Sequence, residues 1–276
     1  MKLCIRAHDL GTTGEESIIN RLRELDIDGV QLVAYKSLGI PHEAGAITAE
    51  RAKAAGDIFR EAGIAVPLVG AYFNPVHPDK AKAEEGKRIF GDYIRTAKLF
   101  GSDLVGSETG SYNGDKWTYH PKNESDDALE TVVASFRSLA KQAKAEGVLI
   151  GMEGAYGHVC KTPERLDHAV RMIGESNIRI IFDIYNYLDK SNVEEMYDIF
   201  SRGIKLFGER IRIYHIKDFR ISPTGELKQC GVGKGIVDYA KLIPQIKEAT
   251  PDASLVLEGT TGEDIACAVG YLRKLL

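Results

Sequence analysis

Four polar side chains that could bind a metal ion end apolar runs in the second half of the chain. The runs cover 148–152, 178–182, 212–214 and 255–257, and the side chains are Glu153, Asp183, His215 and Glu258. Three carboxylates close together repel one another and raise one another's pKa, so a cation between them is the natural compensation. Carboxylate oxygens with one imidazole suit Mn²⁺, Mg²⁺ or Co²⁺, and Zn²⁺ is also acceptable. We therefore expect one divalent metal ion, with Mn²⁺ as the first candidate.

The elements that carry these residues decide whether they meet. Apolar segments that predict strands alternate with segments of helical periodicity. Strands are expected at 2–7, 28–33, 65–70, 103–107, 148–153, 178–183, 212–215 and 255–258. Helices are expected between them, the clearest over 14–25, 48–62, 128–147 and 261–276. Eight strands alternating with eight helices, without a proline-rich linker, indicate an α/β fold: a single (β/α)8 TIM barrel domain over residues 1–276.

A doubly wound open sheet is the main alternative fold. It would carry a glycine-rich phosphate turn after the first strand, where this chain has His8-Asp9-Leu10-Gly11-Thr12. In a barrel the carboxyl ends of all strands converge on one face, so residues 30, 32 and 43 positions apart can meet. Each of the four could instead be an ordinary strand-end residue, but their place at the same end of consecutive strands favours a site.

The bulk composition restricts the partners. The chain has 276 residues, 43% of them hydrophobic, and a net charge of -4, with no long basic block to bind phosphate backbones. We expect no nucleic-acid partner. No segment approaches the roughly 18 consecutive apolar residues of a membrane span, and Met1-Lys2 leads directly into a strand. We expect no membrane partner and a cytoplasmic location.

The four cysteines are dispersed without a C-x-x-C pair, which indicates neither a zinc knuckle nor a disulfide framework. They are expected to be reduced thiols. Cys4 and Cys267 are expected in the core, and Cys160 and Cys230 on loops near the proposed site.

The whole chain resembles the xylose-isomerase-like barrels, a family that includes sugar and sugar-phosphate isomerases and epimerases. The motifs that carry the resemblance are Met152-Glu153, Phe182-Asp183-Ile184-Tyr185-Asn186, His215-Ile216-Lys217-Asp218, the turn Gly231-Val232-Gly233 with Asp238, and Leu257-Glu258-Gly259. The resemblance implies that Glu153, Asp183, His215 and Glu258 hold one divalent metal. It also implies that the two glutamates stand on opposite faces of a bound ketose.

The resemblance implies a mechanism that the residues also permit. The metal would bind a carbonyl oxygen and a neighbouring hydroxyl of a small open-chain keto-sugar or related polyol. It would acidify the adjacent C–H and stabilise the enediolate. Either Glu153 or Glu258 would remove the proton and the other would return one. Return to the opposite face gives an epimerase, and return to the neighbouring carbon gives an isomerase.

The chain departs from the family pattern at three positions. The ketose 3-epimerases usually carry histidine where Asn186 stands, and a second glutamate six residues after the metal-binding one, where this chain has Val159. Many relatives have glutamate near Gln31. These departures leave the identity of the carbohydrate open.

Other polar residues at the same edge are candidates for contact with the carbohydrate: His8, His158, Asn186 and Arg220. His8 could instead be a capped loop histidine. Arg220 could grip a substrate hydroxyl or phosphate, or pair with Asp218 to close a loop. Lys217 is a neighbour of undefined role.

The loop from Glu108 to Asp126 is the longest connection in the chain and carries Trp117, Tyr119 and His120. It could form a lid or a subunit contact. Apolar residues on the outer helices leave a homo-oligomer open.

Three other functions share this fold. An endonuclease IV-like enzyme would need more metal-binding histidines and a basic face. A metal-dependent dehydratase acting on a keto-polyol such as an inosose would use the same metal and base. A non-catalytic sugar-binding barrel would not require the paired bases Glu153 and Glu258.

Overall fold

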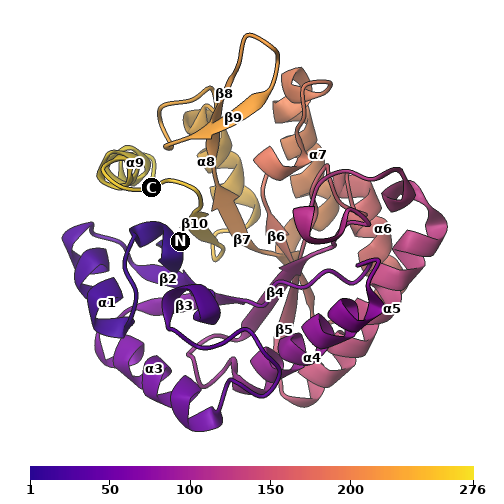
Figure 1. Cartoon of the computed structure of the whole chain (residues 1–276). Coiled ribbons are helices and arrows are strands. Elements are labelled where there is room, and N and C mark those ends of the chain that lie inside the picture. The colour runs from indigo at the N-terminus through magenta and orange to yellow at the C-terminus, as the bar shows by residue number, and fades with distance from the viewer.

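The computed structural model describes residues 1–276 and contains a closed barrel of eight parallel strands (Figure 1). Around the barrel the strands follow the order β1, β10, β7, β6, β5, β4, β3, β2. Their bounds are β1 Leu3–Arg6, β2 Gly29–Leu32, β3 Ala65–Gly70, β4 Leu104–Glu108, β5 Leu149–Glu153, β6 Ile178–Phe182, β7 Ile211–Ile216 and β10 Ser254–Leu257. The predicted (β/α)8 barrel is confirmed.

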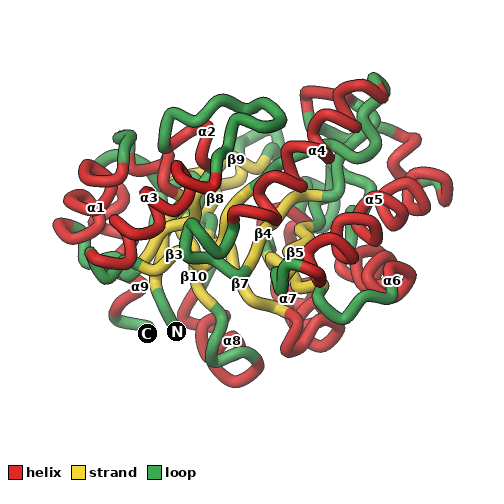
Figure 2. Tube along the Cα trace, turned by 90° about the horizontal axis from the view of Figure 1, so that it is seen from below, coloured by secondary structure: helices red, strands yellow, loops and turns green.

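Helices surround the barrel and pack against its outer face (Figures 1 and 2). They are α1 Glu15–Glu24, α3 Ala49–Glu61, α4 Lys80–Thr96, α5 Asp126–Ala145, α6 Pro163–Ile173, α7 Met196–Phe207, α8 Tyr239–Ala249 and α9 Asp264–Arg273, with a short α2 at Ala34–Ser37. Helix α5 shows why these segments fold as helices. Ser125 caps it by accepting a hydrogen bond from the Ala128 N–H, and an apolar stripe from Leu129 to Ala143 is buried.

Two apolar cores hold the barrel together. The large core lies between strands and helices and contains 75 buried residues. The small core fills the barrel interior and consists of Cys4, Leu68, Leu104, Ile181, Ile213 and Val256. Because the interior is packed with side chains, polar groups gather only where the strands end.

Three details differ from the sequence-based expectation. Cys267, expected in the core, is exposed on α9, because the buried face of that helix is formed by Ile265, Ala268, Val269 and Leu272. The last helix begins at Asp264 and not at residue 261. An unpredicted antiparallel hairpin, β8 Asp218–Ile221 and β9 Leu227–Cys230, follows β7. Its strands are only four residues long, and most of their side chains are exposed or half-buried, so they lack an apolar pattern.

No helix combines the length and the apolarity that a membrane crossing requires.

Two glycines in helices test the packing of the barrel wall. A Cβ at Gly56 of α3 would overlap the main-chain carbonyl oxygen of Leu99, whereas a Cβ at Gly270 of α9 would meet no atom within 4 Å. We expect Gly56→Ala to lower the free energy of unfolding by about 1–3 kcal/mol, because the two backbones must separate. We expect the control Gly270→Ala to raise it by about 0.5–1 kcal/mol through helix propensity. Urea denaturation measures the free energy of unfolding of both variants. Equal effects of the two substitutions would contradict the close approach of Gly56 to the Leu99 carbonyl.

Candidate metal centre

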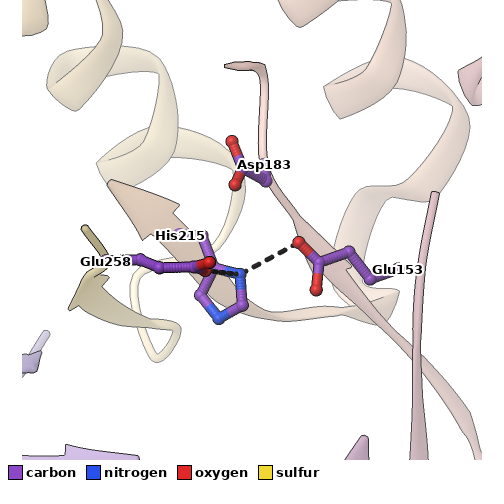
Figure 3. A group of neighbouring side chains, drawn as sticks. All are labelled: Glu153, Asp183, His215 and Glu258. Atoms are coloured by element: carbon purple, nitrogen blue, oxygen red, sulfur yellow. Dashed lines mark hydrogen bonds and ion pairs between the residues drawn. The ribbon is translucent and has the colours of Figure 1, made fainter. Parts of the chain in front are cut away.

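The four predicted ligands come together at one end of the barrel. Glu153 is the last residue of β5, Asp183 follows β6, His215 lies near the end of β7, and Glu258 follows β10. Each offers one ligand atom, and these atoms all lie within 4.8 Å of one another. Figure 3 shows the side chains pointing toward a common centre. Consecutive parallel strands bring them together because their carboxyl ends share one face of the barrel.

The imidazole of His215 has one nitrogen toward the carboxylates and one away from them. Nδ1 lies 3.0 Å from Glu153 Oε1 and 2.9 Å from Glu258 Oε2 (Figure 3). Nε2 lies 2.8 Å from the side-chain oxygen of Gln31. Nδ1 is therefore the nitrogen that can bind a metal ion, and Gln31 orients the ring from behind.

Two further cations compensate the carboxylates. The Lys217 ammonium lies 2.9 Å from Asp183 Oδ2 and 3.0 Å from Glu258 Oε1. Arg6 donates to Glu258 Oε1 at 2.6 Å and makes two further hydrogen bonds to Asp9. The cluster thus contains fixed positive charge from the chain itself.

The pKa values reflect burial and this dense charge. Burial raises the pKa of Asp183 to about 6, although Lys217 opposes the shift. Burial alone would lower the pKa of His215, but Glu153 and Glu258 raise it to about 10. Burial would raise the pKa of Glu258, but Lys217, His215 and Arg6 hold it well below its usual range. The carboxylates therefore depend on neighbouring cations to stay charged.

The residues fit a divalent ion. Asp183 is fully buried, and its Oδ2 has no hydrogen bond of good geometry although Lys217 is near. A buried carboxylate oxygen without a hydrogen bond is costly unless a cation satisfies it. Three carboxylates and one imidazole are a donor set for Mg²⁺, Mn²⁺ or Zn²⁺.

Two of the predicted substrate contacts lie beside the cluster. Asn186 donates from Nδ2 to Glu153 Oε1 at 2.8 Å and accepts from the Lys217 ammonium at 3.0 Å. His158 is buried, its Nε2 lies 3.2 Å from the Trp117 carbonyl, and its ring packs 5.4 Å from the indole. Burial lowers the pKa of His158 to about 4, so the ring is neutral and supports Trp117.

The other two make no hydrogen bond to the cluster. His8 is half-buried in a 3-10 helix, Ala7–Leu10, and its Nδ1 has no hydrogen-bond partner. Arg220 is exposed on β8 and donates to the Lys234 carbonyl. It does not pair with Asp218, whose carboxylate accepts from the backbone N–H groups of Phe219, Gly233, Gly235 and Val237. The structure therefore gives Arg220 a contact within its own loop.

A pocket of about 510 Å³ opens above the cluster. Of the four ligands, only Glu153 and Glu258 line it. Its inner wall also contains Arg6, Tyr72 and Glu108, and its outer wall includes Lys36, His42 and Trp117. Trp117 has a φ of 52°, in the left-handed region that bulky residues rarely adopt. Its place on the wall agrees with a role for this loop at the site, but the predicted lid or subunit contact stays a prediction.

Several residues in or beside this pocket were not predicted from the sequence. Arg6 is the last residue of β1 and Glu108 the last of β4, so both carry the strand-end signal that identified the ligands. Burial raises the pKa of Glu108 to about 7. Lys217 was noticed only as a neighbour. Gln31 and Tyr72 are uncharged, and no pattern in the sequence indicates that they contact each other.

The model of the xylose isomerase-like TIM barrel family matches residues 19–275 of the chain. A search of curated proteins gave no match.

Three solved structures illustrate the likeness of the fold. A D-tagatose 3-epimerase-like protein has a TM-score of 0.77 at 18% identity, and the alignment covers 100% of this chain and 97% of that one. The IOLI protein with a bound zinc atom has a TM-score of 0.74 at 18% identity, with 100% and 96% covered. The probable 3-DHS dehydratase AsbF from Bacillus anthracis has a TM-score of 0.73 at 13% identity, with 99% of both chains covered. At such identities the likeness concerns the fold, and activity must be argued from the site.

The donor set predicts that metal binding needs all four ligands. We expect the wild-type protein to bind about one Mn²⁺, and Asp183→Asn or His215→Ala to lower the affinity more than about 100-fold, because each removes a ligand. Elemental analysis after equal exposure to Mn²⁺ and calorimetric titration measure this. The control is Asp167→Asn, a buried aspartate of α6 paired with Arg171 and Arg210. Equal metal content in all four proteins would refute the site.

Proposed function

Because the chain belongs to the xylose isomerase-like TIM barrel family, we propose that it is a divalent-metal-dependent isomerase or epimerase of a small keto-sugar or related polyol. One observation carries the proposal. Among four side chains within 4.8 Å of one another, the two glutamates face a pocket of about 510 Å³, while Asp183 and His215 lie behind them. This arrangement supports the proposal that the two glutamates act on a substrate, whereas Asp183 and His215 only bind a metal ion.

A divalent ion at Glu153, Asp183, His215 and Glu258 would supply Lewis acidity, drawing electrons from a carbonyl and acidifying the adjacent C–H. We propose Mn²⁺ first, with Mg²⁺, Co²⁺ and Zn²⁺ as alternatives. The chain supplies the acid and the base, and positions them.

Glu153 is suited to accept the proton. Its Oε1 accepts a hydrogen bond from Asn186 and faces His215 Nδ1 at 3.0 Å, on the side where the metal ion would lie, whereas no group of the chain donates to its Oε2. Oε2 is therefore the atom that would take a proton from the substrate carbon. Asn186, tied to Lys217 on its other side, would keep the carboxylate from turning away.

Glu258 stands across the cluster from Glu153, with His215 between them (Figure 3). Since its pKa is held well below the usual range, Glu258 would first take up a proton from water. It would then return that proton to the opposite face of the same carbon in an epimerase, or to the neighbouring carbon in an isomerase. Arg6 and Lys217 hold its Oε1 at 2.6 and 3.0 Å, which leaves the orientation of the carboxylate well defined.

A dehydratase acting on a keto-polyol is the second candidate, and Glu108 favours it. This further pocket carboxyl ends β4, where it pairs in register with Glu153 of β5. If Glu153 removed a proton from the carbon beside the carbonyl, Glu108 could protonate the leaving hydroxyl. Water would depart and a C=C bond conjugated with the carbonyl would form. A purely sugar-binding barrel would perform neither reaction.

Incubation of the Mn²⁺-loaded protein in D₂O with a panel of ketoses and inososes distinguishes these functions. We expect deuterium in a recovered isomer or epimer without loss of water. Loss of water would establish the dehydratase instead, and an unchanged panel would favour a binding protein. Product NMR and mass spectrometry report all three outcomes.

Substitution of the proposed acid and base tests the mechanism. We expect Glu153→Gln and Glu258→Gln each to reduce turnover at least about 1,000-fold, because one proton transfer is removed from each reaction. Turnover is compared at equal metal occupancy, since both residues are also ligands. The exposed Glu130→Gln on α5 is the control and should retain full turnover. An active Glu258→Gln protein would rule out the two-base mechanism.

A further inference from the structure

Tyr72 lies on the pocket wall, two residues beyond the end of β3, and shares that wall with Glu108, Glu153 and Glu258. It has no contact with a metal ligand that would give it a role in holding the ion. Its one hydrogen bond within the chain joins its hydroxyl oxygen to the Gln31 side-chain amide nitrogen at 2.8 Å. The direction of that hydrogen bond decides what the hydroxyl can do.

The direction follows from His215. Nδ1 faces the carboxylates Glu153 and Glu258 at 3.0 and 2.9 Å. With a metal ion on Nδ1, the neutral ring carries its hydrogen on Nε2, and in the imidazolium both nitrogens carry one. In either state Nε2 is a donor, so the group 2.8 Å away must be the Gln31 carbonyl oxygen. The Gln31 amide hydrogens then point to Tyr72.

Tyr72 therefore accepts a hydrogen bond from Gln31 and must direct its own O–H elsewhere. No group of the chain accepts that hydrogen. The charged groups that act most strongly on the phenol are Glu258, Glu153, Glu108 and Arg6, all of which line the pocket. Burial, followed by the three carboxylates, raises the pKa of Tyr72 well above its usual value, so the hydrogen is retained.

The ring itself is held in place. A Cβ at Gly70 would lie 2.9 Å from Tyr72 Cε2 and 3.1 Å from Val33 Cγ2. The absence of a side chain at Gly70 is what allows the ring to pack against the strand at this point. The ring of Tyr72 is thus positioned by its packing against Gly70, and its hydroxyl oxygen by the hydrogen bond from Gln31.

We propose that Tyr72 donates a hydrogen bond to an oxygen atom of the substrate, and that Gln31 orients the hydroxyl for this purpose through its contact with His215. The acceptor would be one of the oxygens that the substrate turns toward the metal centre, such as the carbonyl oxygen or the adjacent hydroxyl of a ketose or keto-polyol. This inference rests on the proposed function, because it places the substrate over Glu153 and Glu258. Tyr72 would contact substrate, and Gln31 would be a positioning residue.

Acetohydroxamate is the probe. Its two adjacent oxygens on a planar unit resemble a ketose that has lost its C–H proton, and it can chelate a divalent ion. Calorimetry on the Mn²⁺-loaded protein would give its affinity, and a separate titration would give that for Mn²⁺. We expect Tyr72→Phe to weaken acetohydroxamate binding about tenfold, through loss of one hydrogen bond, while Mn²⁺ affinity stays unchanged. The matched control Tyr197→Phe removes a phenol hydroxyl of α7 that lies outside the pocket and accepts from the Asp238 N–H, and it should change neither affinity.

Gln31→Glu tests the orientation. A carboxylate there would accept hydrogen bonds from both His215 and Tyr72, so the tyrosine hydrogen would be withdrawn from the pocket. We expect acetohydroxamate to bind about as weakly as to Tyr72→Phe, while Mn²⁺ affinity is retained or increased. The double variant with Tyr72→Phe and Gln31→Glu should bind acetohydroxamate about as weakly as either single variant. A purely structural role of Gln31 would lower both affinities together.

The outcomes are separable. Unchanged acetohydroxamate affinity in Tyr72→Phe would overturn the proposal, and unchanged affinity in Gln31→Glu would overturn the orientation by Gln31. A wild-type protein that binds Mn²⁺ but not acetohydroxamate would also overturn it, while the D₂O experiment would still decide the proposed function. A wild-type protein that binds no Mn²⁺ would remove the proposed function and this inference with it.

Discussion

Repulsion among three carboxylates in a small buried space is the constraint on which the site depends. Glu153, Asp183 and Glu258 offer oxygens within 4.8 Å of one another and of His215. Burial by itself would raise the pKa of Asp183 and of Glu258 and so favour their neutral forms. Lys217 and Arg6 supply compensating charge from within the chain, and a divalent ion would supply more. The positions of Lys217 and Arg6 beside the carboxylates meet this requirement for positive charge.

The barrel makes such a concentration of charge tolerable because it confines it to one end. The interior layer around Cys4, Leu68 and Ile213 is apolar, so the strands carry no charge along their buried length. At the carboxyl end of the barrel, charged side chains stand at the last residue of a strand or just after it, as in Arg6, Glu108 and Glu153. The hairpin that follows β7 adds backbone donors that satisfy Asp218, which keeps this carboxylate out of the cluster.

Within the cluster, position supports a separation of two proposed tasks. Asp183 and His215 do not line the pocket, which suits residues proposed only to bind a metal ion. Glu153 and Glu258 line it, which suits residues proposed also to act on a substrate. Gln31 stands behind His215 and links the metal centre to the pocket wall at Tyr72. Membership of the family establishes the fold, and this separation of tasks is the basis for arguing the chemistry.

The sequence by itself determined the barrel and the four polar residues that cluster at its end, because both depend on local signals. Alternating apolar and amphipathic segments predict strands and helices, and a charged residue at a strand end can be recognised without its neighbours. Only the tertiary structure decided which polar residues meet. The contacts of Lys217 with Asp183 and of Gln31 with His215 join residues 34 and 184 positions apart, and they depend on strand order and side-chain direction. Arg220 shows the converse. It follows β7, the strand of His215, but the hairpin carries it into solvent, which no local pattern indicates.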